Sequence, residues 1–271
     1  MIKNKVHVVI VDFFKGEKLL DLLKCLDEQD AVFINVIVID NSMSDDNFSV
    51  YSSFTSKSIN IEFYQSPCNL GYSKACNIGA TKASSDSDFI LFLNPDIYIK
   101  DSRLIKEAID SYLSLNNVGS LGVSQENPDG TYENVARSFP QISSLIVKRV
   151  PLLSKIFSDK LSKYLSVENT YNINSQLQPV DWLQSSFLLI DIKTWTELGG
   201  FNERYYIFMA DVDIGKRIQD FMKYSYLDRS LVISADGVRS SNGGLKNIFS
   251  SKVLRLHIID AIKYFLSRKN N

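Results

Sequence analysis

The stretch Phe89-Ile90-Leu91-Phe92-Leu93-Asn94-Pro95-Asp96 decides the fold class of this chain of 271 residues. Its first five residues are apolar and β-branched or aromatic in large part, which is typical of a buried parallel strand. Proline cannot continue a sheet ladder, so we expect the strand to end before it and Asp96 to lie in the following loop. In open α/β sheets, ligands bind at that edge. A carboxylate there suits Mg²⁺ or Mn²⁺, which prefer hard oxygen ligands. For this segment alone, the alternative is an aspartate that caps a helix or turn.

Strands and helices alternate along the first half of the chain. Short β-branched runs predict the strands, and leucine-rich or amphipathic runs predict the helices. In order, we expect a strand at Val6–Val11, a helix at Glu17–Glu28, a strand at Phe33–Ile39, a helix near Asp45–Phe54, a strand at Ile59–Gln65, a helix around Tyr72–Ala83 and a strand at Phe89–Leu93. This order predicts a Rossmann-like α/β fold with a mostly parallel central sheet and helices on both faces.

The second half of the chain is less regular. We expect strands at Gly119–Gln125, Val180–Ile190 and Tyr226–Ser234, a helix at Asp211–Met222 and a closing amphipathic helix at Ser251–Ser267.

The composition is that of an ordinary globular protein, with 45% hydrophobic residues, 23% charged residues and a formal net charge of −1. The near-neutral charge argues against a nucleic-acid binder. Cys25, Cys68 and Cys76 form no CxxC pair and are expected to be reduced thiols. The two histidines are too few for a histidine zinc site or a Ser-His-Asp triad, and His7 is expected in the core. Without a signal-peptide pattern or a membrane-spanning apolar stretch, the protein is expected in the cytoplasm.

Polar residues follow several of the predicted strands. Asp12 follows the first, Asp40 and Asn41 follow the second, and Asp96 follows the Phe89–Leu93 strand. Each of them alone is more often a turn or cap residue, but together they line one edge of the sheet. One carboxylate there can accept from a base imide or a ribose hydroxyl while another holds a metal. This edge is therefore expected to bind a nucleotide.

The segment Asn69-Leu70-Gly71 opens the helix that contains Asn77. Backbone N–H groups at a helix start favour anions, so these residues are expected to contribute to the same site. Neither a GxGxxG motif after the first strand nor a P-loop is present, which excludes both of those nucleotide-binding classes.

A second polar cluster runs from Gly199 to Arg217. Asp211 and Asp213 open a helix whose N-terminus stabilises negative charge, and Arg217 is spaced to pair with Asp213 along one face. A carboxylate fixed at a helix start, near aromatic residues, can act as a general base toward a sugar hydroxyl. The alternative is a capped surface helix.

Eight short motifs occur in order along the chain. They are Val-Ile-Val (9–11), Ile-Asp-Asn-Ser (39–42), Asn-Leu-Gly-Tyr (69–72), Asn77, Leu-Asn-Pro-Asp (93–96), Asp-Trp (181–182), Gly-Gly-Phe-Asn-Glu (199–203) and Asp-Val-Asp (211–213). This series, over roughly residues 6–240, resembles family 2 glycosyltransferases and is most similar to their rhamnosyltransferase-like branch.

The resemblance implies a GT-A fold, a nucleotide-sugar donor, a divalent metal (Mg²⁺ or Mn²⁺) and inversion at the anomeric carbon. Asp96 matches the metal-binding aspartate of the family's DxD-like motif, with Asn94 at its first position. Asp40 matches the aspartate that contacts the base, and Asp211 matches the catalytic base. Residues 1–240 would then form the glycosyltransferase domain, with a nucleotide-sugar half (1–125) and an acceptor half (126–240), and residues 241–271 would be a C-terminal amphipathic helix.

The chain departs from the family pattern at three places. Ala210 stands where the family usually has glutamate, and Asp236 is found where a histidine is usual. An aspartate can also ligate Mg²⁺ or Mn²⁺, so Asp236 is expected to be a metal ligand. Asp12-Phe13-Phe14 replaces the usual Thr-Tyr-Asn after the first strand.

These features favour an inverting glycosyltransferase of bacterial surface polysaccharide (O-antigen or capsule) synthesis. The branch favours dTDP-L-rhamnose as donor, with a UDP-hexose or UDP-N-acetylhexosamine as the alternative. Ala210 and the missing histidine motivate a rival hypothesis, a non-catalytic nucleotide-sugar-binding protein. A sugar nucleotidyltransferase is a weaker rival, because no Gly-rich, Arg-containing loop lies near the N-terminus.

The acceptor is expected to be a glycan or a polyprenyl-diphosphate-linked saccharide. Arg137, Asp181 and Trp182 are expected to flank it together with Asp213, and the alternative for Trp182 is a core residue. Leu145–Leu165 and the closing helix mix apolar and basic residues, which is typical of helices that lie on anionic membrane surfaces. We therefore expect peripheral association with the inner face of the cell membrane. The alternative for the closing helix is packing on the catalytic domain.

Overall fold

The computed structural model describes residues 3–83, 87–140, 175–236 and 252–267. Its strands are β1 (Asn4–Asp12), β2 (Val32–Asp40), β3 (Asn60–Gln65), β4 (Phe89–Leu93), β5 (Ile97–Tyr98), β6 (Val118–Glu126), β7 (Ala136–Arg137), β8 (Leu177–Val180), β9 (Trp182–Leu183), β10 (Phe187–Asp191) and β11 (Tyr224–Ala235). Its helices are α1 (Gly16–Asp27), α2 (Asp45–Tyr51), α3 (Tyr72–Thr81), α4 (Leu104–Leu113), α9 (Ile192–Leu198), α10 (Ala210–Asp220) and α11 (Lys252–Ser267).

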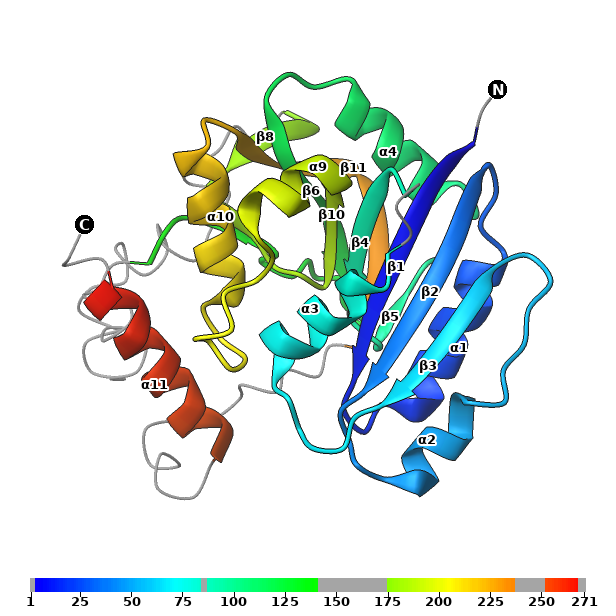
Figure 1. Cartoon of the computed structure of the whole chain (residues 1–271). Helices are drawn as coiled ribbons and strands as arrows, with labels where there is room; N and C mark the ends of the chain where they lie inside the picture. The colour runs from blue at the N-terminus through cyan, green and yellow to red at the C-terminus, as the bar shows by residue number, and fades with distance from the viewer. Residues whose placement is uncertain (1–2, 84–86, 141–174, 237–251, 268–271) are drawn as a thin grey trace.

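A sheet of nine strands forms the centre of the described molecule, in the order β3-β2-β1-β4-β10-β6-β11-β5 with β8 beside β11 (Figure 1). β3, β2, β1 and β4 are parallel to one another. β10 is antiparallel to β4 and β6, and β6 is parallel to β11. The predicted α/β fold with a mostly parallel sheet is confirmed.

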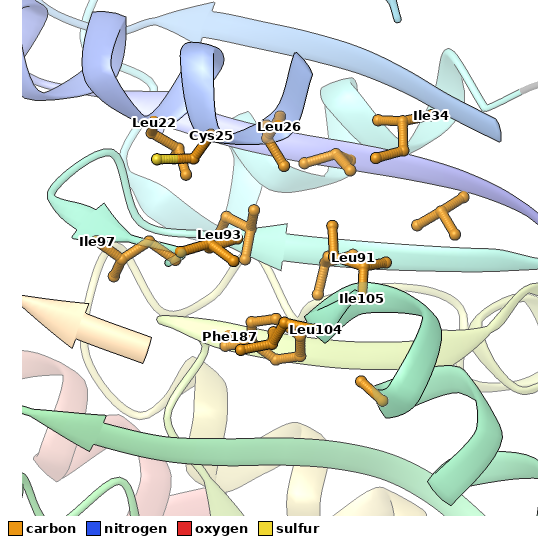
Figure 2. Close-up of a cluster of buried hydrophobic side chains, with 14 of the residues drawn as sticks. Leu22, Cys25, Leu26, Ile34, Leu91, Leu93, Ile97, Leu104, Ile105 and Phe187 are labelled. Atoms are coloured by element: carbon orange, nitrogen blue, oxygen red, sulfur yellow. The ribbon is translucent and has the colours of Figure 1, made fainter. Parts of the chain in front are cut away.

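Strand side chains alternate between two hydrophobic cores on opposite faces of this sheet. In β1, Val8 and Ile10 belong to the core under α1, α2 and α4, whereas Val9 belongs to the core under α3, α9 and α10. Figure 2 shows part of the first core, to which Leu22 of α1 and Leu104 of α4 contribute. Because both faces are covered, the strands read as continuous apolar runs in the sequence.

The strand expected at Val180–Ile190 is wrong as a single element. The structure divides it among the end of β8, which pairs with β11, the short β9, which pairs with β7, and β10, which pairs with β4. The polar residues Gln184, Ser185 and Ser186 separate β9 from β10. At this break the chain leaves the small two-stranded sheet and enters the central one, so one apolar stretch serves two sheets.

Other elements follow the sequence closely. Helices α4 and α9 were not expected, although the buried residues of α4 have helical spacing: Leu104, Ile105, Ala108, Ile109 and Tyr112. His7 is 3% exposed, as predicted, with Nε2 3.0 Å from the Gly79 carbonyl oxygen. The three cysteines are unpaired.

The closing helix is present as α11 and lies on the α10 side of the molecule, away from α1 and α2 (Figure 1). It packs on the second core through Tyr264, which is 2% exposed. The basic segment Leu145–Leu165 lies outside the described residues. Among the helices of the described ranges, none has both the length and the apolar character that crossing a membrane requires.

Candidate active site

Strand register brings Asp12 and Asp40 together at one edge of the sheet. The two residues are the last of β1 and β2 and lie opposite each other in the parallel ladder. Both carboxylates are fully buried. Asn47, from the first turns of α2, donates to Asp12 Oδ2 (2.6 Å) and more weakly to Asp40 Oδ1 (3.5 Å). Asn47 was not predicted, and it holds two carboxylates that would otherwise repel each other.

The two aspartates differ in what they leave open. Asp12 accepts through Oδ1 from the Lys15 N–H (2.9 Å) and through Oδ2 from Asn47 and the Tyr51 hydroxyl (3.4 Å). Burial raises the pKa of Asp12, against the lowering effect of the Asn47 and Lys15 bonds. Asp40 accepts from the Ser42 N–H (3.0 Å), but its Oδ2 is buried without a partner in the described part of the chain. Asp40 therefore has an acceptor available for a ligand, whereas the bonds of Asp12 are internal.

Asp96 and Asp236 meet although they are distant in sequence. Asp96 directly precedes β5 and Asp236 directly follows β11, and these strands are antiparallel with Ala235 opposite Ile97. The Lys15 ammonium lies 3.1 Å from Asp96 Oδ2 and 3.0 Å from Asp236 Oδ2. Lys18 also pairs with Asp236.

Two carboxylates that converge on one cation have the chemistry of a Mg²⁺ or Mn²⁺ site. The Lys15 ammonium lies between the two carboxylates, at the place where such an ion would bind. Although burial opposes it, pairing with Asp236 and Asp96 raises the pKa of Lys15, which keeps the ammonium charged. No group of three metal-ligating side chains occurs within the described ranges, so a metal at this place would need further oxygen ligands from a bound diphosphate or water.

Asn94 directly follows β4. Its N–H donates to the Ser186 carbonyl oxygen (3.1 Å), which ties the end of β4 to the segment before β10. The neighbouring Ser185 hydrogen-bonds Asp211. Asn94 is therefore connected to the predicted base through the segment Ser185-Ser186.

The backbone amides before α3 are engaged by the protein itself. The Leu70 N–H donates to Asn41 Oδ1 (3.0 Å), and the Gly71 N–H donates to Asn69 Oδ1 (2.9 Å). Asn41 Nδ2 in turn donates to the Gly71 carbonyl (3.1 Å). The Tyr72 N–H donates to the Tyr206 carbonyl (2.7 Å). These three N–H groups are therefore occupied by the protein itself, and a contribution of Asn69 and Gly71 to a nucleotide site stays a prediction.

Asn77 connects α3 to the loop after α9. Its Nδ2 donates to the Phe201 carbonyl (2.8 Å) and to Glu203 (3.0 Å), and its Oδ1 accepts from the Phe201 N–H (2.8 Å). These bonds occupy the amide with the Gly-Gly-Phe-Asn-Glu motif. They explain the residue as a loop anchor, so we do not assign it a nucleotide contact.

Asp211 lies in the first turn of α10, where the N-terminal dipole favours a negative charge. Its Oδ1 is buried without a partner among the described residues. Burial raises its pKa from 3.8 to about 6, against the lowering effect of hydrogen bonds from Ser185 and the charge of Arg137. Tyr72 and Cys76 of α3 lie near enough to Asp211 to be affected by its charge. Both are neutral, since burial raises the pKa of each. With a pKa of about 6, the Asp211 carboxylate can both accept and release a proton near neutral pH, which the predicted role as general base requires.

Asp213 forms the predicted pair with Arg217. Arg217 Nε donates to Asp213 Oδ2 (2.8 Å), and the same guanidinium donates to the carbonyls of Leu198 and Gly200. The pair fastens α10 to the end of α9. A contact between Asp213 and an acceptor stays a prediction.

The predicted acceptor residues lie together near α10. Trp182 is 6% exposed and donates from Nε1 to the Ser138 carbonyl (2.9 Å), which fits the core alternative rather than stacking on a sugar. Asp181 accepts from the Phe139 N–H (2.8 Å). The Arg137 guanidinium lies 5.5 Å from the Trp182 ring, in the range of cation–π contact, and its charge reaches Asp211.

Two further residues, Ser185 and Asp260, were missed by sequence reasoning. Ser185 lies in a short polar break and Asp260 in an amphipathic helix, and neither belongs to a sequence motif. Ser185 hydrogen-bonds Asp211, and Asp260 accepts from backbone N–H groups shortly before Asp211, contacts that form only in the folded chain.

Comparison with known proteins adds the family. The model described as glycosyl transferase family 2 matches residues 7–174. The chain belongs to glycosyltransferase family 2. As a family 2 member it is a glycosyltransferase, and the resemblance seen in the sequence is confirmed. Asp211, Asp236 and α11 lie beyond the matched segment.

Curated relatives point to one branch of the family. An N-acetylglucosaminyl-diphospho-decaprenol L-rhamnosyltransferase of Mycobacterium tuberculosis is 26% identical over 220 residues, which are 78% of this chain and 69% of the relative. The rhamnosyltransferase WbbL of Escherichia coli is 24% identical over 185 residues, which are 68% of this chain and 64% of WbbL. The chain thus spans about two thirds of these relatives.

Solved structures share the fold. The mannosyltransferase PcManGT from Pyrobaculum calidifontis, in complex with GDP-Man and Mn²⁺, superposes with a TM-score of 0.61 at 14% identity over 97% of this chain and 65% of that one. S. aureus TarS 1-349 in complex with UDP-GlcNAc gives 0.58 at 15% identity over 88% and 60%. At these identities the likeness shows the GT-A fold alone.

Proposed function

We propose that this family 2 glycosyltransferase transfers rhamnose, with inversion, from dTDP-L-rhamnose to a polyprenyl-diphosphate-linked saccharide in bacterial surface polysaccharide synthesis. The observation that carries the proposal is Asp211, a buried carboxylate with an unpartnered oxygen and a pKa of about 6 at the start of α10. The curated rhamnosyltransferase relatives support the donor sugar, and the decaprenyl-diphosphate acceptor of one relative supports the acceptor class.

In this mechanism Asp211 takes the proton of the acceptor hydroxyl. The freed oxygen forms a bond to the anomeric carbon on the face opposite the nucleotide. The bond between that carbon and the diphosphate oxygen breaks, and the nucleoside diphosphate leaves with the electron pair. Asp96 and Asp236 would hold a divalent cation, which supplies charge neutralisation for the departing diphosphate. Asp40 Oδ2 is the acceptor we assign to the donor's base or ribose.

The test of the base is Asp211→Asn, assayed for turnover and for nucleotide affinity. Transfer is expected to fall at least about a hundredfold while nucleotide affinity changes little, because the amide cannot accept the proton. In the wild type, transfer is expected to fall as pH drops through about 6, where Asp211 becomes protonated. The exposed Asp220, on the same helix, provides the control Asp220→Asn. Unchanged turnover in Asp211→Asn would remove it as the base.

A UDP-sugar is the second candidate donor, because TarS, a structural neighbour, is seen in complex with UDP-GlcNAc. A thermal-shift panel of nucleotide sugars with Mn²⁺ separates the two, since a ligand that binds the folded state raises its melting temperature. Stabilisation by dTDP-rhamnose supports the proposal. If UDP-sugars alone stabilise the protein, the rhamnose assignment fails.

A further inference from the structure

The segment 204–209, which leads into α10, is held by α11. We call residues 204–209 the base loop, because Asp211 follows them by two residues. The N–H of Tyr206 donates to Asp260 Oδ1 (3.2 Å), and those of Ile207 and Phe208 donate to Asp260 Oδ2 (3.1 and 3.0 Å). One carboxylate of the closing helix therefore satisfies three consecutive backbone donors.

Asp260 is fully buried, so water could not take over its hydrogen bonds to the base loop unless the surrounding structure moved. A buried carboxylate is tolerated when hydrogen bonds and charge satisfy it. Lys263, one turn later, lies 3.7 Å from Asp260 Oδ1 and donates to the Arg204 carbonyl (2.8 Å). His257, one turn earlier, packs edge-on against Phe208 with ring centroids 4.3 Å apart. Three side chains of α11, spaced three residues apart along one face, thus contact the base loop.

The opposite side of the base loop is held by α3. Ser73 Oγ donates to the Tyr205 carbonyl (2.6 Å), and the Tyr72 N–H donates to the Tyr206 carbonyl (2.7 Å). The loop is therefore clamped between α3 and α11. It ends at Met209 with φ +67°, a left-handed turn that directs the chain into α10.

We infer that Asp260 is a positioning residue for Asp211: by fixing the base loop from α11 it sets the place of the carboxylate that takes the acceptor proton. The inference rests on the proposed role of Asp211. It predicts that the closing helix belongs to the catalytic apparatus although it lies outside the segment matched by the family model.

The experiment compares Asp260→Asn and Asp260→Ala with Asp220→Asn, an exposed substitution of the same chemistry. Displacement of a reacting group by about 1 Å costs about a hundredfold in rate, so we expect kcat to fall by up to that factor in Asp260→Ala, with Asp260→Asn between it and the wild type. The donor KM should stay within about twofold, because the donor contacts that we assign, Asp40 and the Asp96–Asp236 pair, lie outside the base loop. The acidic limb of the kcat profile should move to lower pH, because a displaced Asp211 is more hydrated.

A loss of stability alone would leave the limb of the pH profile in place and lower the amount of active enzyme, which active-site titration with labelled nucleotide corrects. Wild-type kcat in correctly folded Asp260→Asn and Asp260→Ala would overturn the inference. Amide hydrogen exchange of residues 206–208 tests the role of Asp260 independently of the proposed function. If Asp260→Asn loses this protection and the wild type shows no transferase activity, the proposed function is rejected. The hold of Asp260 on the base loop is then still supported. Unchanged protection would reject the clamp.

Discussion

At the scale of single residues, charge placement decides what the site can bind. Lys15 lies between Asp96 and Asp236 and occupies the place where their oxygens would hold a metal. A fixed ammonium competes with a divalent cation for the same carboxylates. The metal is therefore expected to enter with the donor, whose diphosphate gives Lys15 another anionic partner.

The substitution Lys15→Met tests this competition. Without nucleotide, Mn²⁺ affinity is expected to rise about tenfold, because the competing charge is removed while the carboxylates remain. Binding is measured by titration calorimetry or by the spin-resonance signal of free Mn²⁺. Lys24→Met is the matched control, since Lys24 lies in α1, the helix that Lys15 directly precedes, and pairs with the exposed Asp21. Equal Mn²⁺ affinity in Lys15→Met and the wild type would contradict the competition.

Single residues also mark how far the sequence leads. Asp40, Asp96 and Asp211 could be singled out because each lies where a predicted strand or helix begins or ends. The cation bridge through Lys15 could not, because it needs a register between β5 and β11 that local patterns do not specify. Asp260 was hidden for the same reason, since its partners lie more than fifty residues earlier.

At the scale of elements, hydrophobic periodicity located most strands and helices. Phe89–Leu93 was predicted with the observed bounds because Asn94-Pro95 ends it. The stretch 180–190 was misread because periodicity reports burial and not the sheet to which a strand belongs. Its chain switches sheets at Ser185 and Ser186, the residues beside Asp211 and Asn94.

The start of α3 depends on a glycine. Gly71 has φ +76°, and a Cβ there would lie 2.6 Å from the Tyr206 carbonyl oxygen. Gly130 has nearly the same φ, +78°, with nothing within 4 Å. Gly71→Ala therefore adds a steric clash to the backbone strain, while Gly130→Ala adds strain alone.

We expect Gly130→Ala to lower the free energy of unfolding by about 1 kcal/mol and Gly71→Ala by about 2 to 4 kcal/mol, measured by urea denaturation. Gly71→Ala should also reduce transfer, because the clash pushes on the base loop. Equal losses of stability in the two variants would show that the contact with Tyr206 is soft.

At the scale of the whole molecule, α11 has two faces with different tasks. Asp260 and Tyr264 are buried against the protein, whereas Ile259, Ile262 and Leu266 are 45%, 53% and 60% exposed. The three apolar residues have the spacing of one helical face, and the exposed Arg255 lies one turn before them. The predicted alternative, packing on the catalytic domain, therefore holds for one face, and the other face still presents an apolar stripe.

We predict that this stripe rests on a lipid surface, which would bring the site to a polyprenyl-linked acceptor. Each stripe residue gains apolar burial in the interface, and each nearby cation gains about 1 kcal/mol from anionic lipid. Co-sedimentation should show binding to anionic vesicles that weakens in high salt. The combined variant Ile259→Ser, Ile262→Ser and Leu266→Ser should bind at least about tenfold more weakly. Leu113→Ser, at an apolar residue 61% exposed on α4 across the sheet, should bind like the wild type. If the wild type is absent from anionic and neutral pellets alike, the stripe does not meet lipid, and the acceptor must reach the base loop from solution.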